Sequence, residues 1–359
     1  MGEIFLKKRL ALIFQTATVF VGTIVGAGLA SGQEITQFFT TYGFKSFFGL
    51  LICAAFYILV SSAMVSISLK FNLNSYSDFI TLVSPGFLGK ITDLLTGLFL
   101  VAGASIILAG GGALLKQYFG IPRVVGVIIM AAISLFTLLR DTKGLITINT
   151  LIVPSLTTII IAVFLFYLIN HGDIMSIDYM QSVRTFKNEI IPGQWIVSSF
   201  LYAGFNMLFS SGVLVPLSKE MKSKSIIITG ASIGALLLTL LAFLINSMLL
   251  VNIPEIFQFE IPLLHVASKF GTLIQLLLLA VIWCEMFSTE VSDIYSVGKT
   301  LEQKYKISYK TGVILVLLVA LPISQLGFKN LITYLYPGFG VISLVFVYQI
   351  FKFYFKHCK

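Results

Sequence analysis

A glycine-rich stretch, followed at once by an amide and a carboxylate, interrupts the first apolar segment of this chain. Residues 22–32 include four glycines, and Gln33 and Glu34 come directly after them. Irregular backbone at membrane depth persists only where protein buries it or where it lines a polar cavity. A carboxylate at that depth costs at least about 2.5 kcal/mol unless it is paired or hydrated. The pattern therefore predicts a broken helix that forms part of a binding site.

Two interpretations of this stretch compete. The pairs Gly22/Gly26 and Gly28/Gly32 have the G-x-x-x-G spacing that lets membrane helices pack closely. Packing alone does not explain the polar residues that follow. The role of Glu34 stays open among three possibilities: binding a substrate ammonium, carrying a coupling proton, or capping free backbone amides.

A second polar group lies near the centre of the long apolar run 268–299. Ser288 and Thr289 are adjacent there, and Glu285 shares a helical face with them. The structural alternative is that the hydroxyls bond to carbonyls of the preceding turn. An ionisable residue near the bilayer midplane is a functional hypothesis by default. Glu285 is therefore expected either to add charge to a cation site or to carry a proton.

Two more carboxylates follow on another face of the same predicted helix. Asp293 lies about 12 Å beyond Glu285 toward the cytoplasm, at 1.5 Å per residue. Glu290 and Asp293 are expected to be charges of an intracellular gate or vestibule, each paired with a basic residue.

The elements that must position these residues are membrane spans. The 359 residues are 57% hydrophobic and 11% charged, with a mean hydropathy of +0.99, which is typical of an integral membrane protein. A span needs about 20 apolar residues. The longest connection, about 170–193, is expected to be an amphipathic external loop. Ten apolar stretches are long enough, near 10–41, 44–69, 88–117, 123–139, 145–169, 194–218, 225–250, 268–299, 309–325 and 330–355.

Charge placement predicts the orientation. The net charge is +9, and the basic residues are scattered between apolar runs, so no nucleic-acid-binding patch is expected. Most of them fall on one side if the N-terminus is cytoplasmic, which predicts that both termini lie in the cytoplasm. The three cysteines have no metal-ligand or redox spacing and imply no disulfide framework.

The chain also divides into two similar halves. A second irregular stretch, 202–212, precedes Pro216 in the sixth apolar segment. Five spans in each half would place the two copies in opposite orientations, with the binding site at their interface. The sequence thus predicts an all-α polytopic membrane protein whose single domain, 1–359, holds about ten helices. These form a 5+5 inverted repeat, about 10–170 and about 190–355, with spans 1 and 6 discontinuous.

The residues at these two breaks resemble a known superfamily. The motif Gly22-x-x-Val25-Gly26-x-Gly28, with Tyr202-Ala203-Gly204-Phe205 and the later 216–220, resembles the amino acid–polyamine–organocation superfamily with its LeuT-type fold. The string 26–34 is similar to that of the YkvI-like amino acid permeases of bacteria.

The break itself predicts where a solute binds. Free amides at Ala27, Gly28, Ser31 and Gly32, together with the dipole of the following half-helix, would favour an anionic substrate group. The resemblance implies that the carbonyls of Gly22 and Val25 form a sodium site with the hydroxyls of Ser288 and Thr289. Leu29 stands where sodium-coupled amine transporters place an asparagine, so a second sodium site is not expected.

Small and aromatic residues complete the predicted pocket. Residues 103–105 in the third span, including Ser105, and the glycines at 110–112 leave room for a small solute. Tyr202 and Phe205 are candidates for an aromatic lid, although aromatic side chains are more often packing. Asn206 is the stronger candidate because an amide at that depth needs a partner.

These residues predict an ion-coupled secondary active transporter, a symporter of a small amino acid or related amine-bearing solute that works by alternating access. The coupling ion is Na⁺ or H⁺, with Glu34 and Glu285 as proton carriers in the second case, and no other cofactor is expected. The alternative is a membrane receptor of small solutes that uses the same fold without transport. No enzyme is expected, because the three histidines lie near span ends or in the tail and no P-loop is present. The expected location is the bacterial cytoplasmic membrane, with the lipid bilayer and the solute as partners and the oligomeric state open.

Overall fold

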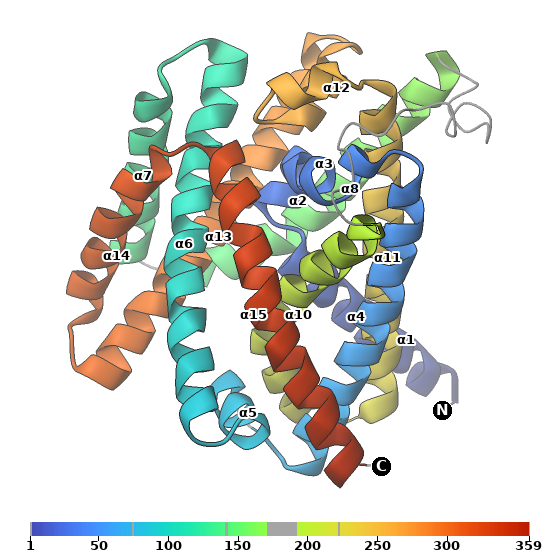
Figure 1. Cartoon of the computed structure of the whole chain (residues 1–359), viewed down its shortest axis with the longest axis vertical. Coiled ribbons are helices and arrows are strands. Elements are labelled where there is room, and N and C mark those ends of the chain that lie inside the picture. The colour runs from blue at the N-terminus through green and yellow to red at the C-terminus, as the bar shows by residue number, and fades with distance from the viewer. Residues whose placement is uncertain (1, 74, 141–142, 171–191, 222, 359) are drawn as a thin grey trace.

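The structure is a computed structural model that describes the chain except residues 1, 74, 141–142, 171–191, 222 and 359 (Figure 1). The described part is entirely helical. The amphipathic loop expected at 170–193 lies almost wholly outside the described residues. In chain order the helices are α1 (Gly2–Ile24), α2 (Ala27–Ser31), α3 (Gln33–Phe38), η1 (Thr40–Tyr42), α4 (Lys45–Lys70), α5 (Tyr76–Val83), α6 (Phe87–Phe119), α7 (Arg123–Arg140), α8 (Lys143–Asn170), α10 (Gln194–Met221), α11 (Lys224–Val251), η3 (Glu255–Gln258), α12 (Pro262–Ser268), α13 (Thr272–Tyr305), α14 (Tyr309–Ser324) and α15 (Phe328–His357).

The first span is broken where its glycines predicted a break. Helix α1 ends at Ile24, and Gly26 has extended backbone (φ −118°, ψ −171°) before the short helix α2. Gly32 then adopts the left-handed conformation (φ +79°) between α2 and α3, which a residue with a side chain rarely does. Two glycines thus divide the span into three helical pieces.

The break expected in the sixth span is absent, because α10 runs without interruption from Gln194 to Met221. One of its glycines serves packing instead. A Cβ atom on Gly204 would lie 3.1 Å from Leu344 of α15, so this glycine allows the two helices to approach closely. Serine hydroxyls donate to backbone carbonyls within the helix, for example Ser210 to Asn206 at 2.8 Å.

The long helices pack in two groups. Helices α1, α4, α10, α11 and α15 contact one another in sequence-distant pairs, and α6, α7, α13 and α14 form the second group. Figure 1 shows the second group on the left, with α2 and α3 between the groups, while α8 contacts both. Both termini lie at one end of the bundle and α12 lies at the other.

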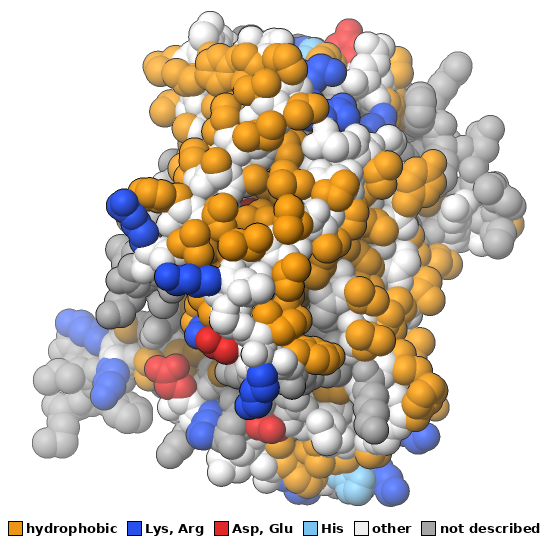
Figure 2. Space-filling view, turned by 90° about the vertical axis from the view of Figure 1, so that its left-hand side faces the viewer, with side chains coloured by type: hydrophobic (Ala, Val, Ile, Leu, Met, Phe, Trp, Pro, Cys, Tyr) orange, Lys and Arg blue, Asp and Glu red, His pale blue; other side chains and the backbone are white. Residues whose placement is uncertain are grey.

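Seven described helices are long and apolar enough to cross a membrane: α4, α6, α7, α10, α11, α13 and α15. Shorter apolar segments, Pro154–Ile169 of α8 and Tyr309–Ser324 of α14, add to them. Figure 2 shows a broad apolar area on the face next to α7 and α14, with most charged side chains around its margins. Exposed side chains such as Ile128 (56%) and Leu318 (61%) contribute to this face. An apolar surface of this extent is suited to lipid, so the chain is a polytopic α-helical membrane protein.

Candidate functional site

The side chain of Glu34 folds back onto the broken part of the first span. Glu34 lies on α3 and is only 4% exposed. A Cβ atom on Gly28 of α2 would collide with its carboxyl group, so the carboxyl occupies the space that a side chain at residue 28 would fill. The Oε2 atom of Glu34 is buried as well. A side chain at residue 28 would therefore have to displace the Glu34 side chain.

Two tyrosine hydroxyls face this carboxyl group from other helices. Tyr202 of α10 and Tyr336 of α15 both interact electrostatically with Glu34. The Tyr202 hydroxyl is itself buried, and so is Oε1 of Gln33, the neighbour of Glu34. Buried polar atoms that lack partners are rare in folded proteins and call for an explanation. The Glu34 carboxyl and the Tyr202 hydroxyl are hydrogen-bonding neighbours of each other, so Oε1 of Gln33 is the atom left without one.

Glu34 is without a cationic partner in the described part of the chain. The ion pairs found there are Arg123–Glu260, Glu255 with His265 and Lys269, and Lys299–Glu302. None of the described hydrogen bonds runs from a backbone amide to the Glu34 carboxyl, so the capping role is unsupported. Because an ionised buried carboxylate needs a counter-charge or water, the remaining roles are binding a cation and carrying a proton.

Aromatic rings surround the carboxyl site. The ring of Phe38 lies 5.4 Å from Tyr202 and 5.9 Å from Phe205, centroid to centroid. Phe205 in turn lies 4.7 Å from Tyr336. Tyr202 and Phe205, both expected as lid residues, thus form one cluster with residues of α3 and α15. Rings of this kind attract organic cations over their faces.

The side chains of two other predicted site residues form hydrogen bonds within the protein. The side-chain amide of Asn206 donates to the Tyr57 hydroxyl and to the Tyr202 carbonyl, both at 3.1 Å. The buried hydroxyl of Ser105 donates to the carbonyl of Val101 at 2.9 Å. The partner that Asn206 needs at this depth is therefore Tyr57 rather than a solute in this conformation.

The amides expected to bind an anionic substrate group are only partly free. The Gly32 amide donates to the Leu29 carbonyl at 3.0 Å, and the Ser31 hydroxyl donates to Gly28 at 2.9 Å. Helix α2 spans only five residues, and Ala27 begins it. The Glu34 carboxyl already lies against Gly28, so a second anion there would meet a like charge.

The predicted sodium ligands lie on elements that come close together. Helix α13 packs against α2, directly after the carbonyls of Gly22 and Val25. No described hydrogen bond reaches those two carbonyls, as expected at the end of a helix. Ser288 is buried, and the Thr289 hydroxyl bonds to the carboxyl group of Glu285, which is 5% exposed. The shared face predicted for Glu285 and Thr289 is present, and the sodium site itself stays a prediction.

Glu290 and Asp293 are placed differently from the expectation. Glu290 is completely buried, and neither of its carboxyl oxygens has a hydrogen-bond partner. It is therefore not a vestibule charge. Asp293 points at α6, where a Cβ atom on Gly103 would lie 2.8 Å from its Oδ2. No basic residue of the described chain forms an ion pair with either carboxylate, so the expected pairing stays a prediction.

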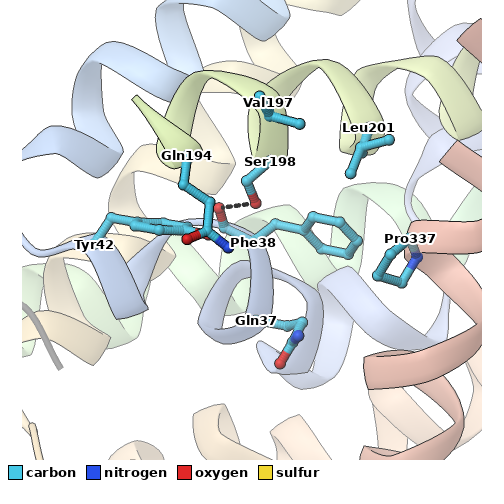
Figure 3. Close-up of a pocket in the computed structure, with 8 residues that line it drawn as sticks. All are labelled: Gln37, Phe38, Tyr42, Gln194, Val197, Ser198, Leu201 and Pro337. Carbon is cyan, nitrogen blue, oxygen red and sulfur yellow. Dashed lines mark hydrogen bonds between the residues drawn. The ribbon is translucent and has the colours of Figure 1, made fainter. Parts of the chain in front are cut away.

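A cavity of about 140 Å³ lies beside the site (Figure 3). It is lined by residues from the end of α3, the start of α10 and the middle of α15. Phe38 and Pro337 belong to this lining, and they are near neighbours of Glu34 and Tyr336 along their helices. Ser198 donates to the carbonyl of Phe38 at 2.8 Å and holds α10 against α3 there. Phe38 thus belongs both to the lining of this cavity and to the ring cluster.

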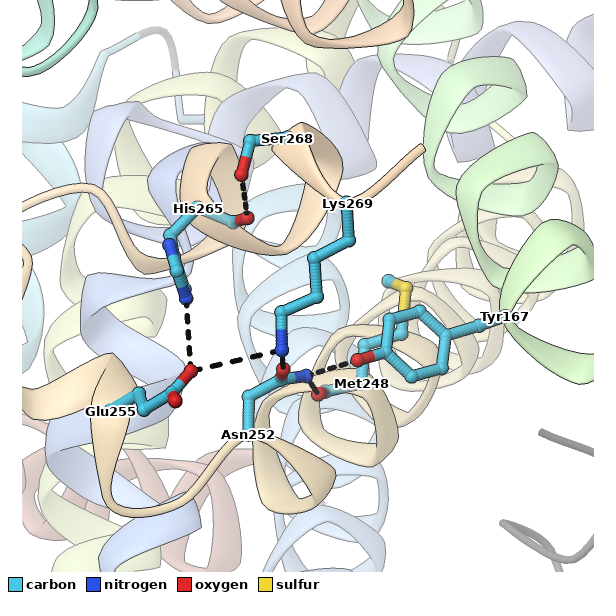
Figure 4. Close-up of polar contacts among 7 residues, drawn as sticks. All are labelled: Tyr167, Met248, Asn252, Glu255, His265, Ser268 and Lys269. Atoms are coloured by element: carbon cyan, nitrogen blue, oxygen red, sulfur yellow. Dashed lines mark hydrogen bonds and ion pairs between the residues drawn. The ribbon is translucent and has the colours of Figure 1, made fainter. Parts of the chain in front are cut away.

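The end of the bundle that carries α12 is closed by polar contacts. Figure 4 shows Asn252 beside Tyr167, Lys269 and Glu255, with His265 on the other side of the glutamate. The two nitrogen–oxygen distances to Glu255 are 3.4 Å from His265 and 3.7 Å from Lys269.

The segment before α12 is held as well. Gln117 of α6 donates to the Ile261 carbonyl at 2.9 Å and accepts from its amide at 3.0 Å. Arg123 of α7 pairs with Glu260. These contacts hold the segment that precedes α12 against α6 and α7, which belong to the second helix group.

Sequence reasoning missed Tyr336 and identified Asp293 without its surroundings. Tyr336 lies next to Pro337 in α15, and Asp293 interacts electrostatically with it. Tyr336 carried no signal, because the chain has 14 tyrosines. Asp293 was found as an intramembrane carboxylate, but helical spacing could not show which neighbouring helix it faces.

Known proteins resemble this chain in sequence and in fold. It is 30% identical over 335 residues to the membrane protein YkvI of Bacillus subtilis, and the matched residues cover 93% of each chain. It is 26% identical over 326 residues to YyaD of the same organism, covering 91% of this chain and 92% of YyaD. No protein-family model matches.

Solved structures share the fold at low sequence identity. The inward-facing conformation of Mhp1 superposes with a TM-score of 0.68 at 15% identity, covering 96% of this chain and 76% of that one. A manganese transporter of Eremococcus coleocola gives 0.67 at 18% identity, covering 98% and 80%. The chain therefore has the LeuT-type fold of these two proteins.

Proposed function

The chain belongs to the family of the Bacillus subtilis membrane protein YkvI, and we propose that it is an ion-coupled symporter of a small amine-bearing solute. An amino acid or a related amine is the solute class that the site favours. The fold is that of Mhp1 and of a manganese transporter, which supports transport as the activity.

One observation carries the proposal. Glu34 is buried at a break in the first span, without a cationic partner among the described residues, and the hydroxyls of Tyr202 and Tyr336 are the groups that face its carboxyl. A solute ammonium would supply the missing counter-charge and hydrogen-bond donors. The surrounding rings of Phe38, Phe205 and Tyr336 add cation–π attraction.

A metal ion fits this position less well than an ammonium group. Among the described residues there is no cluster of three or more His, Cys, Asp or Glu side chains that could hold a metal. Hard divalent cations require six or more oxygen ligands. Glu34 offers one carboxylate among aromatic rings.

The proposed membrane arrangement is the ten-span 5+5 inverted repeat, with both termini in the cytoplasm and the protein in the cytoplasmic membrane. The positive-inside distribution of basic residues supports this orientation. The solute would reach Glu34 alternately from the two sides, with each ligand shifting the balance between two conformations. The ring cluster, which shares Phe38 with the lining of the 140 Å³ cavity, is the proposed barrier on one side.

The coupling ion is proposed to be either Na⁺ at Gly22, Val25, Ser288 and Thr289 or H⁺. The double variant Ser288→Ala with Thr289→Ala removes both hydroxyls and distinguishes sodium coupling from proton coupling. If sodium is used, solute uptake loses its dependence on a sodium gradient. If a proton is used, uptake still follows a pH gradient in this variant.

The experiment that tests the function is uptake into proteoliposomes. A panel of radiolabelled amino acids and amines is offered with sodium and pH gradients imposed separately. We expect at least one solute to accumulate against its gradient under one of them. Binding of a solute without its movement under either gradient would contradict transport and would favour the receptor.

A further inference from the structure

We propose that the solute is an organic amine of net positive charge that carries no carboxylate group, rather than a zwitterionic amino acid. The inference rests on the proposed transport function and narrows its solute class. It follows from the charges and the space around Glu34, where the solute ammonium would bind.

The charge balance at Glu34 admits one cation and no further anion. The ionised carboxylate and an ammonium group form a neutral, charge-assisted pair, and Glu34 is only 4% exposed. A zwitterionic solute would add its own carboxylate and leave the site with one net negative charge. A buried charge without a partner is costly in a protein interior and at membrane depth. An amino acid therefore requires a second cationic group that an amine does not.

The described helices place no basic side chain where it could supply that group. Each of their Lys and Arg residues lies within eight residues of a helix end, and Arg9 of α1 is the deepest. On α15, Lys329 precedes Tyr336 by seven residues, or about 10 Å at 1.5 Å per residue. Its ammonium group donates to the carbonyl of Phe257, so Lys329 is held at the end of the bundle that carries α12.

Backbone amides at a half-helix N-terminus are the other group that holds a solute carboxylate inside a membrane. At this break Glu34 lies against them. A Cβ atom on Gly28, in the first turn of α2, would lie 1.9 Å from Oε1 of Glu34 and 2.3 Å from its carboxyl carbon. The Gly32 amide is already bonded to the Leu29 carbonyl at 3.0 Å. A solute carboxylate at this turn would meet the Glu34 carboxylate, so the protein's own anion takes that position.

The proposed sodium position brings a carboxylate of its own. One of its ligands is Thr289, whose hydroxyl bonds to the carboxyl group of Glu285. A sodium ion bound there would be balanced by Glu285. It would leave the charge at Glu34 unchanged.

The walls of the site also suit an organic cation. The ring centroids of Tyr202 and Phe205 lie 5.3 Å apart, and Phe205 lies 4.7 Å from Tyr336. The face of an aromatic ring carries negative partial charge, so it attracts an alkylammonium group and repels an anion. The tyrosine hydroxyls are the donors described around these rings, and both already face Glu34.

Compounds that share a side chain and differ in the carboxylate test the inference. The sets are leucine with leucinamide and 3-methylbutylamine, phenylalanine with phenylalaninamide and 2-phenylethylamine, and lysine with 1,5-diaminopentane. Binding to the full-length protein in lipid is measured by calorimetry, at a pH at which the amino groups are protonated. We expect the amine or the amide of at least one set to bind about tenfold more tightly than its amino acid, or better.

Glu34→Gln tests whether this preference comes from the carboxylate. The variant site holds no charge, so the affinity for the amine should fall by about tenfold or more, the affinity for the amino acid should fall less, and the preference should shrink. Glu34→Asp keeps the charge and should keep the preference. The matched control is Glu302→Gln, which removes an accessible carboxylate that pairs with Lys299 at 2.8 Å and should leave every affinity unchanged. A preference of undiminished size in Glu34→Gln would overturn the inference.

The outcomes separate this inference from the proposed function. Amino acids that bind at least as tightly as their amines and amides, and that accumulate in proteoliposomes, would overturn the inference and leave transport in place. Amines that bind with the expected preference but are taken up under neither gradient would overturn transport and leave the solute class in place. Binding of no member of any set would overturn both.

Discussion

At the scale of single residues, the site is organised by the fit between a glycine and a carboxylate. Gly28 has no side chain, and the Glu34 carboxyl fills that space. The sequence identified both residues by type, since glycines and a carboxylate at membrane depth each need a reason. It could not show that one makes room for the other, because this contact depends on how α3 folds back over α2.

The fit makes Gly28→Ala a specific test. The new methyl group must displace the Glu34 side chain, and overpacking of this kind typically costs 1–3 kcal/mol. We expect the free energy of unfolding to fall by about that amount, measured by thermal denaturation in detergent. The control is Gly26→Ala, because a Cβ atom there meets nothing within 4 Å. Equal stability of the two variants would be incompatible with the placement of Glu34.

At the scale of elements, the two glycine-containing spans behave differently. In the first, Gly26 and Gly32 interrupt the helix. In the sixth, Gly204 and Gly212 lie inside a continuous α10. Composition alone could not separate the two cases, since glycine serves breaks and close helix packing equally well. What distinguishes them is the surroundings: Gly32 needs a left-handed backbone, whereas Gly204 packs against Leu344.

The continuity of α10 predicts the effect of Gly212→Ala. A Cβ atom at this residue meets nothing within 4 Å, and alanine is favoured over glycine in a helix interior by about 0.8–1.0 kcal/mol. We expect a higher melting temperature than for the unmodified protein. Gly204→Ala, whose new atom would lie 3.1 Å from Leu344, should show no such gain. A lower melting temperature for Gly212→Ala would indicate that α10 breaks there.

At the scale of the whole molecule, the sequence predicted the class and the approximate position of every described long helix. This succeeds because each span must be apolar over about 20 residues, a requirement that leaves a strong local pattern. The meeting of α3, α10 and α15 at one site could not be predicted in the same way. Contacts such as that of Phe205 with Tyr336 join residues 131 positions apart and depend on helix packing.

The proposed orientation can be tested with the native cysteines. Cys53 is buried, and Cys284 and Cys358 are both half-buried. Cys358 lies at the end of α15, beside the C-terminus. A membrane-impermeant maleimide should label Cys358 in inside-out vesicles and leave it unlabelled in right-side-out vesicles. Cys358→Ser should remove that signal. Labelling of Cys358 in intact right-side-out vesicles would place the C-terminus outside.

The most direct test of the central claim compares the unmodified protein with Glu34→Gln for uptake of the amine and amino acid panel into proteoliposomes. Glutamine keeps the shape of the side chain and removes its charge, so a solute held by the carboxylate should be lost. We predict at least a tenfold fall in solute uptake, equivalent to about 1.4 kcal/mol. The control is Glu302→Gln, which removes an accessible carboxylate that pairs with Lys299 at 2.8 Å and should leave uptake unchanged. Uptake by Glu34→Gln equal to that of the unmodified protein would contradict the assignment of Glu34 as the solute-binding carboxylate.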